Sequence, residues 1–233
     1  VLKMNNILCV DTTSEFCSVS LFDGDQLVNT VNSKIERSHS KLIISLVDKV
    51  IKESKIEISD VDAFSISRGP GSYTGLRIGL SCLKGFCYGL GKPLISLNTL
   101  KILAKSAKEK IDNKDSYICP MVDARRMEVF TKLYNYSMEE ITGDSALILD
   151  NNSFLNYKDK IIYFVGSGSN KFEEISDNVN FKFLPDIIPN SVDMGELSFN
   201  KFLNNDFEEL STFEPNYIKD FYLIKKKDKW IRS

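Results

Sequence analysis

Histidine is almost absent from this sequence, because His39 is the only one in 233 residues. A metal site of the His-x-x-x-His kind needs a second histidine four residues later, and that position holds Ile43. A histidine-based catalytic triad has the same single candidate, with no nucleophile motif near it. We therefore expect neither a metal site nor a hydrolytic triad, and we expect His39 to cap a helix or to lie at an interface.

Paired cysteines and long apolar runs are also missing. None of the five cysteines has a Cys-x-x-Cys spacing, and several lie in apolar stretches, as small core residues do. No run of eighteen apolar residues occurs, and the first residues lack the pattern of a signal peptide. We therefore expect a cytoplasmic protein with reduced cysteines that does not bind a membrane.

The sequence has no excess of positive charge. The formal net charge is −2 and the pI is about 5.6, so no global field would attract nucleic acid. Hydrophobic residues make up 42% and charged residues 27%, as in ordinary soluble globular proteins. The final segment, residues 221–233, is basic, and we expect it to be exposed.

What the sequence does contain is a regular alternation of strand-like and helix-like segments. In the first half we expect strands at 6–10, 17–22, 26–32, 62–67 and 93–96, and helices at 38–53, 73–90 and 98–110. In the second half we expect strands at 117–123, 127–134, 146–149, 160–166 and 180–184, and helices at 170–176 and 193–204. This α/β order fits the two lobes of an actin-like, Hsp70-like ATPase architecture, with lobes at 1–108 and 109–220 and a tail at 221–233.

A glycine-rich stretch, residues 67–79, joins an apolar strand to an apolar helix. Such a turn presents backbone N–H groups to an anion, or allows another backbone to come close. It lacks the lysine of a Walker A loop. Gly69 and Gly71 fit the dinucleotide fingerprint, but Thr74 stands at the third glycine position. We therefore favour close packing over phosphate binding.

The helix at 73–90 is apolar almost all round, with Arg77 and Lys84 as its only charged residues. Gly75 and Gly79 are four residues apart, on one face, and would permit a close helix crossing. The apolar residues of the preceding helix, 38–53, span roughly 200° of its circumference, wider than a surface helix needs. Both helices therefore require more than one apolar neighbour.

Two polar clusters leave alternatives open. Asp11-Thr12-Thr13 lies where actin-like ATPases have their first phosphate loop, but Thr13 replaces the usual glycine, and we favour a structural turn. Asp123 with Arg125 and Arg126 suits phosphate or carboxylate recognition, or equally a solvated hairpin with an Asp–Arg salt bridge.

A resemblance to a known family follows from four motifs. These are Asp11-Thr12-Thr13 with Cys17-Ser18-Val19-Ser20, the string from Arg68 to Gly79, Asp123-Ala124-Arg125-Arg126, and Pro215-x-Tyr217-Ile218-Lys219. Together they resemble the bacterial TsaB (YeaZ) family over residues 4–220, although Lys219 stands where that family more often has arginine. The resemblance implies a two-lobed actin-like (ASKHA) fold with ribonuclease H-like subdomains and no catalytic activity of its own.

The resemblance also implies partners. TsaB-like proteins bind a catalytic TsaD-like subunit which, with a TsaE-like ATPase, transfers a threonylcarbamoyl group to the adenosine beside the anticodon of tRNA. We expect tRNA to be reached only through that complex. The first two helices would bind the TsaD-like subunit or a second copy of this chain. On this basis we predict a partner-binding surface that includes Leu42, Leu46, Gly75, Arg77, Gly79, Ser81 and Lys84.

Two other functions stay open at this stage. A vestigial nucleotide site would comprise Asp11, Thr12, Thr13, Gly69 and Gly71, with weak binding of ATP or ADP and otherwise no cofactor. The chain would then be a weak stand-alone ATPase or kinase-like protein. The other alternative is an inactive homologue of M22-type glycoproteases.

Overall fold

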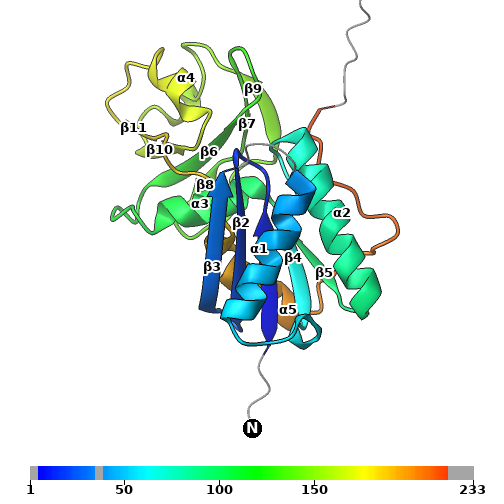
Figure 1. Cartoon of the computed structure of the whole chain (residues 1–233). Helices are drawn as coiled ribbons and strands as arrows, with labels where there is room; N and C mark the ends of the chain where they lie inside the picture. The colour runs from blue at the N-terminus through cyan, green and yellow to red at the C-terminus, as the bar shows by residue number, and fades with distance from the viewer. Residues whose placement is uncertain (1–4, 35–38, 220–233) are drawn as a thin grey trace, which may run out of the picture.

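The computed structural model describes residues 5–34 and 39–219, and within 39–41 it describes the backbone only (Figure 1). The basic tail, the first residues of the chain and Ser38, the first residue of the predicted helix 38–53, lie outside the described residues, as does the side chain of His39. No helix in the described part is long and apolar enough to span a membrane.

The first lobe is built on a five-stranded mixed sheet of order β3-β2-β1-β4-β5. Its strands are β1 Asn6–Asp11, β2 Phe16–Asp23, β3 Gln26–Lys34, β4 Ala63–Ser67 and β5 Leu94–Leu97. β1 to β3 form an antiparallel meander, whereas β4 and β5 run parallel to β1. The crossovers to β4 and β5 pass through two helices, as parallel strands require.

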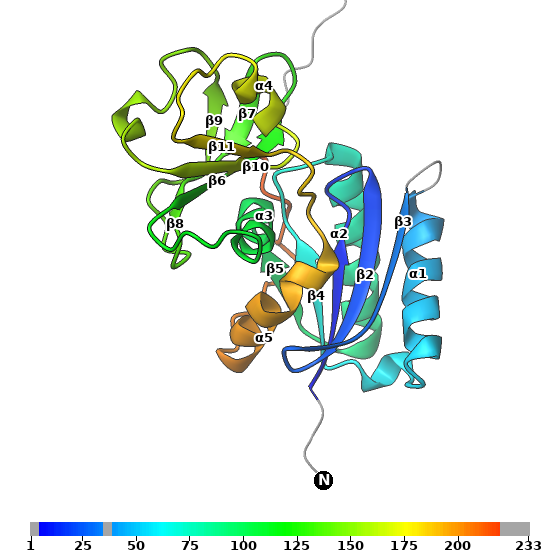
Figure 2. The same cartoon turned by 90° about the vertical axis from the view of Figure 1, so that its left-hand side faces the viewer.

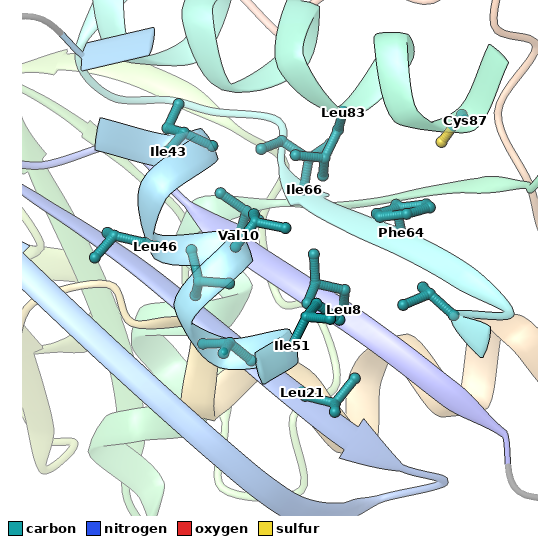
Figure 3. Packing of buried hydrophobic residues seen from close by; sticks show 14 of the residues in the cluster. Leu8, Val10, Leu21, Ile43, Leu46, Ile51, Phe64, Ile66, Leu83 and Cys87 are labelled. Atoms are coloured by element: carbon teal, nitrogen blue, oxygen red, sulfur yellow. The ribbon is translucent and has the colours of Figure 1, made fainter. Parts of the chain in front are cut away.

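Those two helices cover one face of the first sheet side by side (Figure 1). They are α1 His39–Glu53 and α2 Tyr73–Leu90, and α2 begins at the N-cap Ser72, whose hydroxyl accepts the Gly75 amide. Figure 3 shows the core between them and the sheet, where Ile43 and Leu83 point toward Val10 and Ile66. This burial of apolar surface is the main stabilising contribution to the lobe.

The second lobe contains a six-stranded sheet of order β11-β10-β6-β7-β9, with β8 also paired to β6. The strands are β6 Tyr117–Asp123, β7 Glu128–Thr131, β8 Tyr134–Asn135, β9 Ser145–Ile148, β10 Ile162–Val165 and β11 Phe181–Leu184. Helix α4, Ser169–Glu173, packs on it, and phenylalanines form much of the core. Helix α3, Thr99–Lys108, lies between the lobes (Figure 2).

The chain then returns to the first lobe, which corrects the predicted boundary at 109–220. Helix α5, Gly195–Leu203, covers the face of the first sheet opposite α1 and α2 (Figure 2). Its side chains share a core with Ile7, Ile95 and Met194. Three short 3₁₀ helices that the periodicity did not predict complete the fold: η1 Ile58–Asp60, η2 Leu155–Tyr157 and η3 Ser191–Met194.

A strap, defined here as residues 208–219, follows α5 and runs beside α2 toward the second lobe (Figure 1). Asn216 donates its side-chain N–H to the Asp144 carboxylate at 3.1 Å, and the Asn98 amide donates to the same oxygen at 2.7 Å. Asp144 also pairs with the buried Lys132 at 3.0 Å. This carboxylate therefore links the first lobe, the second lobe and the strap.

Candidate functional site

The space beside Gly75 and Gly79 of α2 is filled by another segment of the same chain. A Cβ at Gly75 would overlap the carbonyl oxygen of Thr12, and one at Gly79 would overlap the Thr12 hydroxyl. That hydroxyl donates to the Gly75 carbonyl oxygen at 2.8 Å. Both glycines are buried. Their predicted role on a partner-binding surface is therefore corrected, since the close approach they permit is to the turn after β1.

The turn at Asp11–Thr13 uses its polar groups internally. All three residues are buried, and the Asp11 carboxylate accepts hydrogen bonds from the amide and the hydroxyl of Thr13 at 3.0–3.1 Å. Burial raises the pKa of Asp11, while the hydrogen bonds from Thr13 oppose that shift. This geometry is that of a structural turn, the interpretation favoured from the sequence.

The glycines of the predicted nucleotide site have close backbone neighbours. A Cβ at Gly71 would lie 2.6 Å from Thr13 Cβ, and one at Gly69 would lie 2.8 Å from the Asn216 carbonyl oxygen. The Ser72 amide donates to the Thr13 carbonyl oxygen at 2.8 Å. These glycines thus pack the Gly-rich turn against β1 and the strap. Binding of ATP or ADP stays a prediction.

The two charged side chains of α2 hold the strap. The Arg77 guanidinium lies 4.2 Å from the centre of the Tyr73 ring and donates through Nε to the Tyr217 hydroxyl at 3.0 Å. Lys84 donates to the Phe213 carbonyl oxygen at 2.7 Å. Tyr217 therefore docks the strap onto α2. Of the surface predicted for a partner, these two cations already have partners inside the chain.

The predicted residues of α1 point largely inward. Leu46 is 6% exposed and belongs to the core of the first lobe (Figure 3), which corrects its predicted place on a partner-binding surface. Leu42 is partly buried against the same core. The exposed apolar side chain of α1 is instead Ile44, at 55%.

An outer stripe along α2 remains open. We define it as six uncharged residues, of which five are exposed and Ile78 is half-buried: Thr74, Ile78, Ser81, Gly85, Tyr88 and Gly89. A Cβ at Gly85 or Gly89 would meet no atom within 4 Å, and Tyr88 is 87% exposed. Gly85 and Gly89 were not predicted as site residues, although their four-residue spacing is as visible in the sequence as that of Gly75 and Gly79. Ser81, predicted for a partner, lies on this stripe.

A cleft of about 1100 Å³ separates the Gly-rich turn from the hairpin that joins β6 and β7. The first lobe contributes Thr13, residues 70–74 and Leu76, and the strap contributes residues 216–219. The second lobe contributes residues 122–128 with Phe130, Ile148 and Ser167. Residues from all four motifs noted in the sequence therefore meet at one cleft.

The hairpin carries the two arginines, and the predicted Asp–Arg salt bridge is absent from the described contacts. The Asp123 carboxylate instead pairs with Lys171 at 2.6 Å and accepts the Arg125 backbone amide at 2.5 Å. Lys219 pairs with Glu128 at the back of the cleft. Both arginine side chains are exposed, and neither guanidinium has an ion-pair partner among residues 5–34 and 39–219.

Metal and thiol chemistry have little support in the part of the chain that the structure describes. There, no group of three histidine, cysteine, aspartate or glutamate side chains could hold a metal ion. The cysteines are free thiols. Burial raises the pKa of Cys9 and of Cys119 to about 12, which keeps both protonated and unreactive.

Comparisons with known proteins identify a family and several relatives. The protein-family model "TsaD: tRNA N6-adenosine threonylcarbamoyltransferase" matches residues 27–222. The chain is 26% identical to the tRNA threonylcarbamoyladenosine biosynthesis protein TsaB of Bacillus subtilis, over 97% of this chain and 98% of that protein. It is 25% identical to the tRNA N6-adenosine threonylcarbamoyltransferase of Clostridium kluyveri, over 95% of this chain and 67% of that protein.

Among solved structures, YeaZ from Pseudomonas aeruginosa superimposes with a TM-score of 0.80 at 24% identity, covering 92% of this chain and 100% of that chain. A second Pseudomonas aeruginosa structure, described as similar to peptidase YEAZ, gives a TM-score of 0.79 at 23% identity, over 93% of this chain and 100% of that chain. The predicted fold class, α/β with two actin-like (ASKHA) lobes, is confirmed. The chain belongs to the family described by the TsaD model and, within it, to the TsaB (YeaZ) group.

Proposed function

We propose that this chain is a non-catalytic partner and activator of a TsaD-like threonylcarbamoyltransferase that modifies the adenosine next to the anticodon of tRNA. The names of its relatives, TsaB proteins of tRNA threonylcarbamoyladenosine biosynthesis, support the pathway. In this proposal a TsaE-like ATPase completes the assembly, and tRNA is reached only through the complex.

The observation that carries the proposal is the outer stripe of α2. A helix face that exposes Tyr88 beside two open glycines is suited to close packing against another helix. The turn at Asp11–Thr13 is closed by internal contacts, and Ile43 stands where a metal-binding histidine pair would need its second member. These features favour a contact role over catalysis.

The test is reconstitution with the TsaD-like and TsaE-like proteins of the same organism. We expect threonylcarbamoyladenosine to form in unmodified tRNA only when this chain is added, and we expect none from the chain alone, as measured by nucleoside mass spectrometry. Equal product without the chain would contradict the activator role. Product from the chain alone would make it the enzyme.

The stand-alone ATPase is tested separately by titrating the isolated chain with ATP and ADP and measuring turnover. We expect weak binding or none, without hydrolysis. Tight binding with turnover would instead favour the kinase-like alternative. Size measurement of the chain alone and mixed with the TsaD-like subunit distinguishes a homodimer through the same helices from a heterodimer.

A further inference from the structure

At the edge of the interlobe cleft, the hairpin between β6 and β7 carries two exposed arginines in a left-handed backbone conformation. Arg125 and Arg126 are consecutive residues with φ of +69° and +48°. Glycine and asparagine adopt this left-handed region readily, whereas other side chains do so at a cost. Two arginines therefore stand where the local backbone favours glycine or asparagine, and backbone strain of this kind clusters at functional sites.

The electrostatics of the cleft select an anionic occupant. Two carboxylates line the cleft, Asp123 and Glu128, and they form ion pairs with Lys171 and Lys219 respectively. The guanidiniums of Arg125 and Arg126 have no such partner among the described residues. The facing wall is the first turn of α2, the positive end of an eighteen-residue helix. Both walls of the cleft thus favour negative charge.

The apolar neighbours of the arginines indicate a protein segment. Met127 is 37% exposed and Ile148 is 70% exposed, and both line the cleft together with Tyr73 and Tyr217. Arginine, methionine and tyrosine are enriched in protein interfaces. In addition, Ile148 ends β9, the edge strand of the second sheet. An extended segment would place acidic side chains on the arginines and apolar ones on Met127 and Ile148.

The cleft is continuous with the outer stripe, because Thr74 belongs to both. We propose that the arginine lip, defined as Arg125, Arg126, Met127 and Ile148, is a second docking site for the partner that packs on the outer stripe, and that it binds an acidic segment of that partner. This inference rests on the proposed function, and it adds the second lobe to the interface.

Titration calorimetry of the full chain with the TsaD-like subunit, at low and at high salt, tests the inference. We expect Arg125→Glu with Arg126→Glu to weaken binding by about tenfold or more at low salt and to flatten the salt dependence. A second variant, Arg125→Asn with Arg126→Gly, removes both charges while suiting the left-handed turn. It should keep or raise the thermal stability and still weaken binding.

The control is Lys158→Glu with Lys160→Glu, which makes the same charge change on exposed lysines of the second lobe outside the cleft. It should bind like wild type. Unchanged affinity of the Asn/Gly variant would overturn the inference, as would binding of ADP or inorganic triphosphate that the arginine changes abolish. If the wild-type chain does not bind at all, the proposed function fails as well. Loss of binding in Gly85→Arg but not in either arginine variant overturns this inference alone.

Discussion

Helix α2 carries two pairs of glycines with the same spacing and opposite surroundings. Gly75 and Gly79 lie against Thr12 of the same chain, with no room for a methyl group. Gly85 and Gly89, less than three turns further on, face open space. The comparison teaches that glycine spacing indicates a close approach without indicating what approaches. The inner pair serves the fold, and only the outer pair is free to serve a partner.

The largest effect that would test this comparison is the loss of stability in Gly75→Ala. Its new Cβ would overlap the backbone carbonyl oxygen of Thr12, which cannot rotate away as a side chain could. We expect a loss of about 3 kcal/mol in the free energy of unfolding, measured by denaturant titration. A loss below about 1 kcal/mol would contradict the close contact between Gly75 and Thr12 that distinguishes this glycine pair from Gly85 and Gly89. For the same reason Gly79→Arg would report on folding, not on partner binding.

A smaller effect is expected where α2 holds the strap. Lys84→Met keeps most of the side chain but removes the ammonium that donates to the Phe213 carbonyl oxygen. We expect a loss of about 1 kcal/mol in the free energy of unfolding and faster proteolysis of the strap. Lys114→Met, at an exposed lysine without an ion pair among the described contacts, serves as the control. Equal unfolding free energies and equal proteolysis rates for the two variants would contradict the role of Lys84 in holding the strap.

The smallest effect has the opposite sign. In Gly85→Ala the new methyl group meets no atom, and alanine has the higher helix propensity. We expect the free energy of unfolding to rise by about 0.5–1 kcal/mol in the same titration. Destabilisation would show that this face of α2 is not as open as the structure describes.

The sequence predicted the elements of the fold well, because their signals are local. The apolar run after the Gly-rich stretch placed the helix at 73–90, and alternation with turn residues placed the strand at 117–123, both as observed. The segment predicted as one strand at 127–134 is β7 and β8, separated by residues 132 and 133. Boundaries elsewhere differ by one to three residues, mostly at the ends of helices and strands.

The contacts between distant segments were not predictable in the same way. Nothing local to α5 indicates that it returns to the first sheet, since its apolar face would fit either lobe. Periodicity likewise showed that α2 is apolar on most sides, but not that Thr12 fills one side and the strap another. Several residues predicted for the partner-binding surface therefore lie on buried faces of α1 and α2, and the surface itself stays a prediction.

The most direct test of the central claim compares two glycines that are equally open in the structure. Gly85→Arg lies on the outer stripe, and Gly143→Arg lies on the second lobe, where a Cβ also meets no atom within 4 Å. Affinity for the TsaD-like subunit is measured by titration calorimetry, with thermal unfolding to verify that both variants fold. We predict at least a tenfold loss for Gly85→Arg, because its side chain prevents close helix packing, and wild-type affinity for Gly143→Arg. Undiminished binding by a folded Gly85→Arg variant would contradict the assignment of the outer stripe as the partner-binding surface.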